Sequence, residues 1–192
     1  QVPNMNQCKG CHERSGEMTP IGPSARQMNA SMHYAQGDEN QLDYWSRSNQ
    51  MSEVPASRPK FVSYIDESAV INDRVKAYLD INCAHCHNPK GPAKSSGLFL
   101  DYRYYGTTAY GMMKSPVAAG RGSGGLLYDI VAGKPSESIL HYRMNSQDPG
   151  VMMPELGRAL ALVVQDDLEA LAGRDFEELR SEVAVADHQL VT

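Results

Sequence analysis

The chain has 192 residues, which is enough for one domain or two small ones, and 41% of them are hydrophobic while 21% are charged. This is an ordinary globular composition, and no stretch approaches the roughly 18 consecutive apolar residues that a membrane-spanning helix needs. The net charge of −5 argues against a nucleic-acid-binding protein, because binding to a polyanion favours a basic surface.

Residues 1–67 are polar and rich in turn-forming residues, and they contain the pentapeptide Cys8-Lys-Gly-Cys11-His12 close to the start. Too few residues precede this pentapeptide for a leading helix of ordinary length. Further along, we expect one short helix over residues 39–47, with Asp38 as its N-terminal cap and Leu42 facing inward. This region is predicted to be a small first domain.

Residues 68–183 are predicted to form a second domain. Apolar residues at helical spacing indicate a helix that starts after Asp66, Glu67 or Ser68 and runs into the pentapeptide Cys83-Ala-His-Cys86-His87. Later elements are expected in this order: a long glycine- and tyrosine-rich loop over 88–125, a helix over 137–144, a helix over 165–182 and a tail over 184–192.

Two copies of one five-residue pattern, C-x-x-C-H, use all four cysteines of the chain. This pattern is the attachment signature of c-type haem, in which both cysteines bond to haem vinyl groups and the histidine binds the iron. Cysteines three residues apart lie on one face of a helical turn, so both sulfurs can flank one edge of the ring. The expected tethers are Cys8, Cys11, Cys83 and Cys86.

Paired cysteines also occur in zinc sites, redox dithiols and disulfides, but these roles fit the sequence less well. A four-cysteine zinc ribbon places its pairs roughly 15–20 residues apart, far closer than the two pairs here. A thioredoxin-like dithiol needs an alternating strand and helix context, which is absent around both motifs. Two structural disulfides would leave the repeated histidine unexplained. We therefore predict two covalently attached haem c groups, with His12 and His87 as proximal iron ligands.

The order of helix, C-x-x-C-H, long loop, methionine and closing helix resembles a class I cytochrome c domain. The motifs Tyr78-Leu-Asp-Ile-Asn-Cys-Ala-His-Cys-His-Asn-Pro89, Gly133-Lys-Pro-Ser-Glu-Ser138 and Met153-Pro154 are also similar to those of an uncharacterised family of bacterial secreted proteins. Members of that family carry a C-terminal dihaem region. The resemblance runs from Pro3 to about Gly173 and implies an exported redox protein without an assigned substrate.

The resemblance also implies further residues around the irons. Met153, just before Pro154, stands where class I cytochromes present their sixth ligand, and Met152 is its near competitor. Pro23 matches the proline whose carbonyl accepts the second N–H of the proximal histidine. Apart from the resemblance, three arginines could pair with the haem propionates, because these carboxylates need charged partners. These arginines are Arg121, Arg143 and Arg158.

The sixth ligand of the first haem is left open by the sequence. Met51, just past the expected helix over 39–47, is the closest analogue of a methionine loop and is ranked first. The alternatives are Met18, Met28, Met32 and, for a bis-histidine haem, His33. His85, between the two cysteines of the second motif, is expected to point to solvent or to a neighbouring haem edge.

The fold class expected from these patterns is mainly α: two small cytochrome c-like haem domains with long irregular loops. The expected function is that of a dihaem cytochrome that carries single electrons between redox partner proteins, or of the electron-transfer domain of a larger oxidoreductase. Two alternatives are a dihaem peroxidase-like oxidoreductase and a subunit of an extracellular conductive polymer that associates through haem-edge contacts. The first of these would be an enzyme, whereas the favoured function would not.

We also expect this protein to be exported. Covalent haem attachment normally takes place outside the cytoplasm, so we expect a periplasmic or extracellular bacterial protein. The chain opens at Gln1 without a basic and then apolar signal segment. We therefore expect either that a signal was cleaved or that these residues are the C-terminal part of a longer protein.

Overall fold

The computed structural model describes residues 4–54 and 57–155. Its α-helices are α1 (Met5–His12), α2 (Ala25–Met28), α3 (Gln41–Arg47), α4 (Ile71–Asn82) and α5 (Ile139–Asn145). Its strands form two antiparallel hairpins, β1 (Glu13–Arg14) with β2 (Glu17–Met18) and β3 (Ser31–Tyr34) with β4 (Gly37–Asn40). Its 3-10 helices are η1 (Lys94–Ser96), η2 (Tyr102–Tyr104), η3 (Thr108–Tyr110), η4 (Gly120–Ser123) and η5 (Pro135–Glu137).

The expectation of a mainly α fold, with two cytochrome c-like domains, is wrong. Helices of all kinds account for 36% of the structure, and two hairpins accompany them. Each hairpin has positive φ angles at or beside its turn, at Ser15 and Gly16 in the first and at Gly37, the first residue of β4, in the second. Glycine adopts such angles without steric cost. Both hairpins are short and largely polar, and only the four residues of β3 alternate between polar and apolar, which is too short a run to mark a strand in the sequence.

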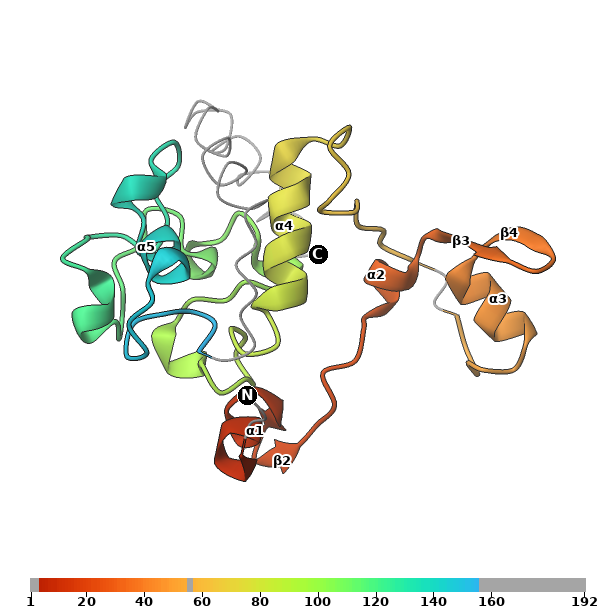
Figure 1. Cartoon of the computed structure of the whole chain (residues 1–192), viewed down its shortest axis with the longest axis horizontal. Helices are drawn as coiled ribbons and strands as arrows, with labels where there is room; N and C mark the ends of the chain where they lie inside the picture. The colour runs from red at the N-terminus through yellow and green to blue at the C-terminus, as the bar shows by residue number, and fades with distance from the viewer. Residues whose placement is uncertain (1–3, 55–56, 156–192) are drawn as a thin grey trace, which may run out of the picture.

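Helix α4 forms one wall of the buried core of the main body, and in Figure 1 it lies on the side of the body nearest to α2. Its Val75 and Leu79 form the buried core together with Leu98, Leu100 and Tyr110, which come from the loop that follows the second motif. The core therefore packs the end of α4 against the chain segment that comes just after His87. In this way the apolar face of one helix positions the second C-x-x-C-H motif.

The predicted helix before the second motif is confirmed, but its start differs. We expected a cap at Asp66, Glu67 or Ser68, whereas α4 begins at Ile71 with Val70 in the capping position. The Asp66 carboxylate instead accepts hydrogen bonds from the backbone N–H and the hydroxyl of Ser68. These bonds hold a turn ahead of the helix, because an aspartate can satisfy a turn as well as a helix end.

The remaining expectations for local structure have mixed outcomes. A helix is present near 137–144, as α5, and another near 39–47, as α3, where Leu42 is buried as expected. The cap of α3 is Asn40 rather than Asp38. The region 88–125 consists of loops and 3-10 turns. The expected helix over 165–182 and the tail lie outside the described residues.

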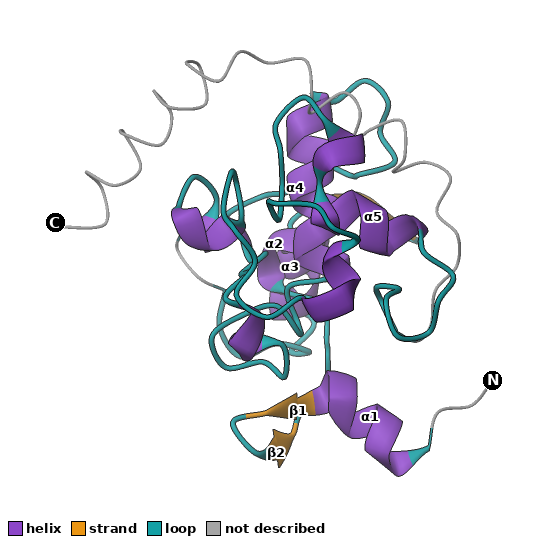
Figure 2. Cartoon of the chain, turned by 90° about the vertical axis from the view of Figure 1, so that its left-hand side faces the viewer, coloured by secondary structure: helices purple, strands orange, loops and turns teal. Residues whose placement is uncertain are grey.

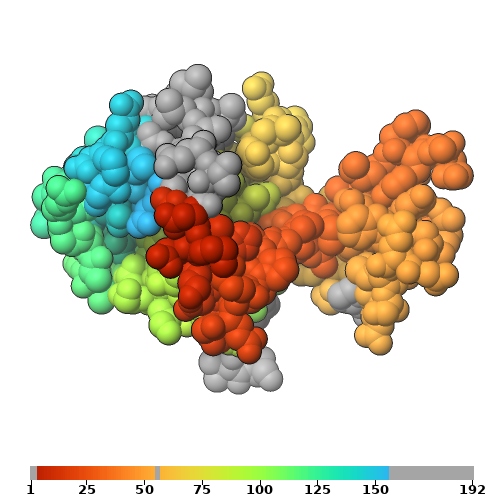
Figure 3. Space-filling view, turned by 60° about the horizontal axis from the view of Figure 1, so that its bottom comes forward, coloured from red at the N-terminus to blue at the C-terminus, as the bar shows by residue number. Residues whose placement is uncertain are grey.

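The segment from β3 to α3 forms an outer lobe beside the main body. In Figures 1 and 3 this lobe (orange) stands apart, whereas the segment around α1 (red) lies against the body. Figure 2, coloured by secondary structure, shows α1 and the β1–β2 hairpin at one end of the molecule. Within the described residues, no helix combines the length and the apolar character that crossing a membrane requires.

Candidate functional site

The first C-x-x-C-H motif occupies α1. Asn4 caps this helix: its side chain accepts a hydrogen bond from the Gln7 N–H, and the Gln7 side chain accepts one from the Asn4 N–H. Such a reciprocal pair satisfies two N–H groups at the helix start. Cys8 and Cys11 are then one helical turn apart and share a face of α1.

The second motif continues α4 beyond its last residue. The Cys83 N–H donates to the Leu79 carbonyl at 2.9 Å, and the His87 N–H donates to the Cys83 carbonyl at 2.9 Å. The motif therefore keeps a helical turn, which spaces its two cysteines as in the first motif. All four cysteines of the chain are free thiols, so neither pair forms a disulfide.

The ring of His12 is oriented by the hairpin that follows it. Its Nδ1 lies 3.1 Å from the Thr19 carbonyl oxygen, and the Thr19 N–H donates to the His12 carbonyl at 2.7 Å. The expected acceptor was the Pro23 carbonyl, and this expectation is wrong because the β1–β2 hairpin folds the chain back and brings Thr19 to the ring first. A proton on Nδ1 that is donated to Thr19 leaves Nε2 with a free lone pair.

The ring of His87 has an equivalent bond. Its Nδ1 lies 3.2 Å from the Leu98 carbonyl oxygen and 3.5 Å from the Ser96 hydroxyl. Burial is the main cause that lowers the pKa of His87 below its ordinary value, and it outweighs the opposing hydrogen bond to Leu98. The imidazole is therefore neutral near pH 7 with its Nε2 lone pair free, which is the form that binds a metal.

The two motifs meet in space although they are far apart in the sequence. A ring nitrogen of His85 and the sulfurs of Cys11 and Cys86 all lie within 4.8 Å of one another. The Cys86 thiol also lies 3.7 Å from the Gly10 carbonyl oxygen, and the Ser15 N–H donates to the Lys90 carbonyl. The second cysteines of the two motifs are thus neighbours.

Burial keeps the cysteines of the second motif protonated. It is the main cause that raises the pKa of Cys83 and of Cys86 to about 12, and the neighbouring Cys11 raises the pKa of Cys86 further. The trio of Cys11, His85 and Cys86 could offer three ligands to a metal such as zinc. Structural zinc sites have four protein ligands, usually with deprotonated thiols, so this trio alone does not complete one.

A cavity of about 490 Å³ lies between the two motifs. This volume is within the roughly 300–1,000 Å³ typical of ligand and cofactor sites. Its lining includes His12 from α1 and His85 from the second motif, together with Arg26 and Arg103. The lining also includes the apolar residues Ile21, Pro23 and Ile81, so a cofactor with apolar faces and negative substituents, such as haem, would fit these residues.

Two buried polar atoms in the described part of the chain lack a hydrogen-bond partner, and both belong to residues that line this cavity. They are the Ser24 hydroxyl and the His85 Nδ1. Buried polar groups are rarely left without a partner, and those that are often mark a functional site. Both atoms are buried, so they lie in the walls of the cavity behind its surface.

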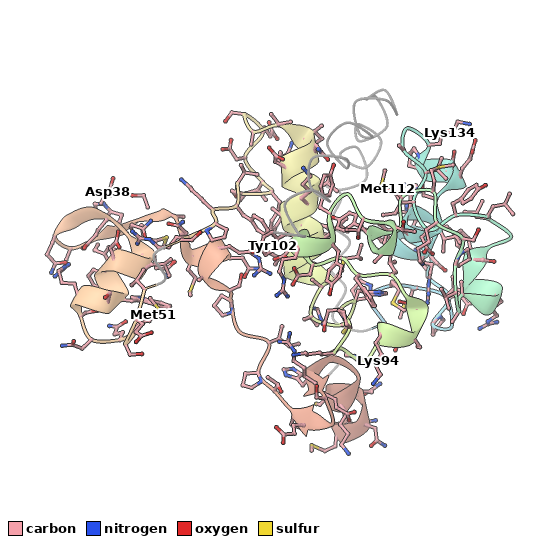
Figure 4. All side chains as sticks on the ribbon, turned by 180° about the vertical axis from the view of Figure 1, so that it is seen from behind. Asp38, Met51, Lys94, Tyr102, Met112 and Lys134 are labelled. Atoms are coloured by element: carbon pink, nitrogen blue, oxygen red, sulfur yellow. The ribbon has the colours of Figure 1, made fainter. Side chains whose placement is uncertain are left out.

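Charged pairs hold the walls of the cavity. The Arg26 guanidinium binds the fully buried Asp80 carboxylate through two hydrogen bonds of 2.9 and 2.8 Å, and Arg103 binds Asp101 through two of 2.8 Å. Arg26 also lies over the Tyr102 ring, which Figure 4 labels between α2 and α4. The arginines are positioned where they could also pair with haem propionates.

The loop that carries Met153 lies beside the second motif. The Met153 N–H donates to the Arg143 carbonyl at 3.0 Å, and the Arg143 guanidinium donates to the Val151 carbonyl at 2.8 Å. The charge of Arg143 contributes to the lowered pKa of His87, so the two side chains are close. The structure thus brings the Met153 loop to the neighbourhood of His87, where Met152 remains its competitor.

The structure places the ligand candidates for the first haem outside the lining of the cavity beside His12. Figure 4 labels Met51 on the outer lobe, away from α1, and its N–H donates to the Trp45 carbonyl. Met18 and Met32 are largely exposed, and His33 pairs with Asp38 at 2.7 Å. None of the sequence-derived candidates lines the cavity beside His12. The structure does not bring Met51 to His12, and the role of Met51 stays a prediction.

Sequence reasoning missed several residues of this site. The role of Arg26 and Asp80 had no local signal, because 54 positions separate these partners. The half-buried position of His85 did have a local signal, because its motif directly follows the apolar face of α4. Comparisons with protein-family models, with curated proteins and with solved structures found no match for this chain.

Proposed function

We propose that this protein is a dihaem c-type cytochrome, which carries single electrons between exported redox partners. One observation carries the proposal. Each C-x-x-C pair is followed by a histidine whose Nδ1 faces a backbone carbonyl, 3.1 Å away for His12 and 3.2 Å away for His87. This bond fixes the tautomer that offers Nε2 to a metal.

The protein residues have separate roles in this proposal. When bound, each haem supplies an iron that accepts or gives up one electron. The four cysteines hold the haem edges by thioether bonds, and His12 and His87 bind the irons. Arg26 and Arg103 stabilise negative propionates at the cavity, while the core around Leu79 keeps water from the second site.

The proximity of the two motifs supports electron exchange within the molecule. The sulfurs of Cys11 and Cys86 lie within 4.8 Å of each other, and each sulfur is expected to bond to an edge of its own haem. Two haems held in this way would have neighbouring edges. An electron that enters at one haem could then leave from the other without a long transfer step.

The proposal includes a location outside the cytoplasm, because covalent attachment of haem normally takes place there. Haem attachment through thioether bonds is carried out there, and the redox partners would be exported proteins too. Docking over small surface patches would suit such transient partners, because electron-transfer complexes bury little area.

A potentiometric titration of the holoprotein, followed by visible absorption, tests the function. We expect two one-electron steps, both reversible, and spectra that added peroxide leaves unchanged. A protein whose haems cannot be reversibly reduced would refute electron transfer. A spectral change at one haem on adding peroxide would instead favour the peroxidase-like alternative.

A further inference from the structure

A buried ion pair lies in the main body, outside the lining of the cavity between the two motifs. The Lys114 Nζ is 2.6 Å from a carboxylate oxygen of Asp129, and the two side chains are only 13% and 8% exposed. Burying two charges costs free energy that their attraction often only offsets, so such a pair adds little net stability. Its position relative to the second motif is therefore more informative than its contribution to stability.

Two short chain segments bring the partners of this pair together. The Asp129 N–H donates to the Lys114 carbonyl at 2.8 Å, and the Ile130 N–H donates to the Gly111 carbonyl at 3.0 Å. Met112 and Ile130 form an isolated parallel β-bridge between the same segments. The pair is therefore held by backbone hydrogen bonds as well as by charge.

Lys114 lies close to the segment that faces the proximal histidine of the second motif. The Leu98 carbonyl oxygen lies 3.2 Å from the His87 Nδ1. Gly97, just before Leu98, has a φ of +62°, and a Cβ placed on it would lie 3.8 Å from the Lys114 Nζ. The ammonium group is thus next to the backbone that presents this carbonyl to His87.

The Asp129 and Leu98 side chains converge on Gly111. A Cβ placed on this glycine would lie 2.5 Å from the Leu98 Cδ1 and 3.2 Å from the Asp129 Cβ. Leu98 also belongs to the buried core. Both partners of the ion pair therefore lie against the same short segment, Asp129 near its leucine and Lys114 near its glycine.

The Ser96 hydroxyl supports this segment from within the same turn. It accepts a hydrogen bond from the Leu98 N–H at 3.2 Å and donates one to the Ala93 carbonyl at 2.7 Å. Its oxygen is 3.5 Å from the His87 Nδ1, farther than the Leu98 carbonyl oxygen. The Leu98 carbonyl is therefore the better acceptor for the ring, and its position decides how strong that bond is.

We propose that Lys114 and Asp129 are positioning residues for His87, the proximal ligand of the second haem. Their ion pair holds the segment 97–98, so that the Leu98 carbonyl keeps its hydrogen bond with the ring. This inference rests on the proposed function, since it assumes a haem iron bound by His87. A proton donated from Nδ1 makes the imidazole a more basic ligand, which favours the ferric state. The pair therefore lowers the reduction potential of the second haem.

Three variants of the holoprotein test this role: Lys114→Gln, Asp129→Asn and the double variant. We expect each of them to raise the reduction potential of the second haem, because each releases the segment and weakens the bond at His87. In the reduced protein, the Nδ1 proton of His87 should also exchange faster with D2O, as followed by NMR. The first haem should keep its potential.

The direction of the shifts separates positioning from a direct effect of charge. A direct effect would lower the potential in Lys114→Gln, raise it in Asp129→Asn and leave it unchanged in the double variant, which keeps the net charge of the protein. That pattern, or the absence of a shift in all variants, would overturn the inference. If a single variant does not fold, the double variant decides, because it leaves no unpaired buried charge.

The exposed pair of Lys134 and Glu137 provides the matched control. Its nitrogen and oxygen are 3.0 Å apart, and its side chains are 59% and 55% exposed. Lys134→Gln/Glu137→Gln should change neither the potential nor the proton exchange. Intact mass of every sample reports haem attachment. A protein with both haems and unshifted potentials refutes this inference alone, whereas a protein without haem refutes the proposed function and this inference with it.

Discussion

The surroundings of the two C-x-x-C-H motifs differ most in how much of them is buried. The second motif extends α4, whose Val75 and Leu79 pack in the core with Leu98, and the carbonyl of Leu98 faces His87. The first motif lies in α1, which has no buried residue. Packing therefore holds the second site, whereas a hairpin and contacts with the second motif hold the first.

This difference has a consequence for the ligands. The second site draws its expected ligands, His87 and Met153, from its own region. The first site has His12 in α1 but no methionine nearby among the residues lining its cavity. The less buried site thus depends on the more buried one through the Arg26–Asp80 pair.

The largest expected effect concerns the ligation of the second haem. Met153→Ala should abolish the near-infrared band of methionine-ligated ferric haem and lower the reduction potential of that haem, since a thioether ligand raises it. Near-infrared absorption of the oxidised holoprotein measures the band. Met152→Ala is the control and should retain it. The reverse pattern would assign the ligand to Met152 instead.

The core should be far more sensitive than α1 to the loss of apolar side chains. Leu79 is 1% exposed and Met5 is 70% exposed. We expect Leu79→Ala to lower the free energy of unfolding by about 2–5 kcal/mol, because it leaves a cavity in the core. Met5→Ala should change it by less than about 0.5 kcal/mol. Urea unfolding of the holoprotein checks both, and equal costs would contradict the comparison.

Glycines near the two motifs provide a second contrast. A Cβ at Gly91 would collide with the Cys86 carbonyl oxygen and would lie 2.7 Å from the Asn88 side chain, whereas a Cβ at Gly10 would meet nothing within 4 Å. Gly91→Ala should therefore destabilise the protein by about 1–3 kcal/mol. Gly10→Ala, inside α1, should be neutral or stabilising by up to about 1 kcal/mol. Thermal unfolding distinguishes them, and a harmless Gly91→Ala would show that this turn can relax.

The smallest expected effect comes from the ion pair that joins the first region to α4. The Asp80 side chain is fully buried and that of Arg26 is 20% exposed. Asp80→Asn should cost about 1–2 kcal/mol, because it weakens charge-assisted hydrogen bonds while Arg26 can still reach water. We also expect faster proteolysis of residues 19–24. Glu39→Gln removes the exposed pair with Arg47 and should change neither measurement. Equal responses would mean that the Asp80 pair does not hold the two regions together.

The sequence alone allowed several features to be predicted for physical reasons. The C-x-x-C-H spacing belongs to one helical turn, so the local shape of each motif follows from neighbouring residues. Apolar residues that recur at helical spacing, among them Val75 and Leu79, indicate α4, because burial of one face stabilises a helix. The same reasoning predicted α5 and α3 to within a few residues.

Features that depend on distant or polar contacts could not be predicted. The β1–β2 hairpin carries no apolar alternation, so its effect on His12, which binds Thr19 rather than Pro23, had no signal in the sequence. The partners Arg26 and Asp80 are 54 residues apart. The contact between Cys11 and Cys86 arises only when the chain folds. Such contacts are specified by the whole fold rather than by local preference.

The mass of the intact protein, made by a host that attaches haem c, tests the central claim most directly. We expect the polypeptide mass plus two haems, one haem in Cys8→Ala/Cys11→Ala, and one haem in Cys83→Ala/Cys86→Ala. The bare polypeptide mass, from a host that loads a known c-type cytochrome in parallel, would contradict the account.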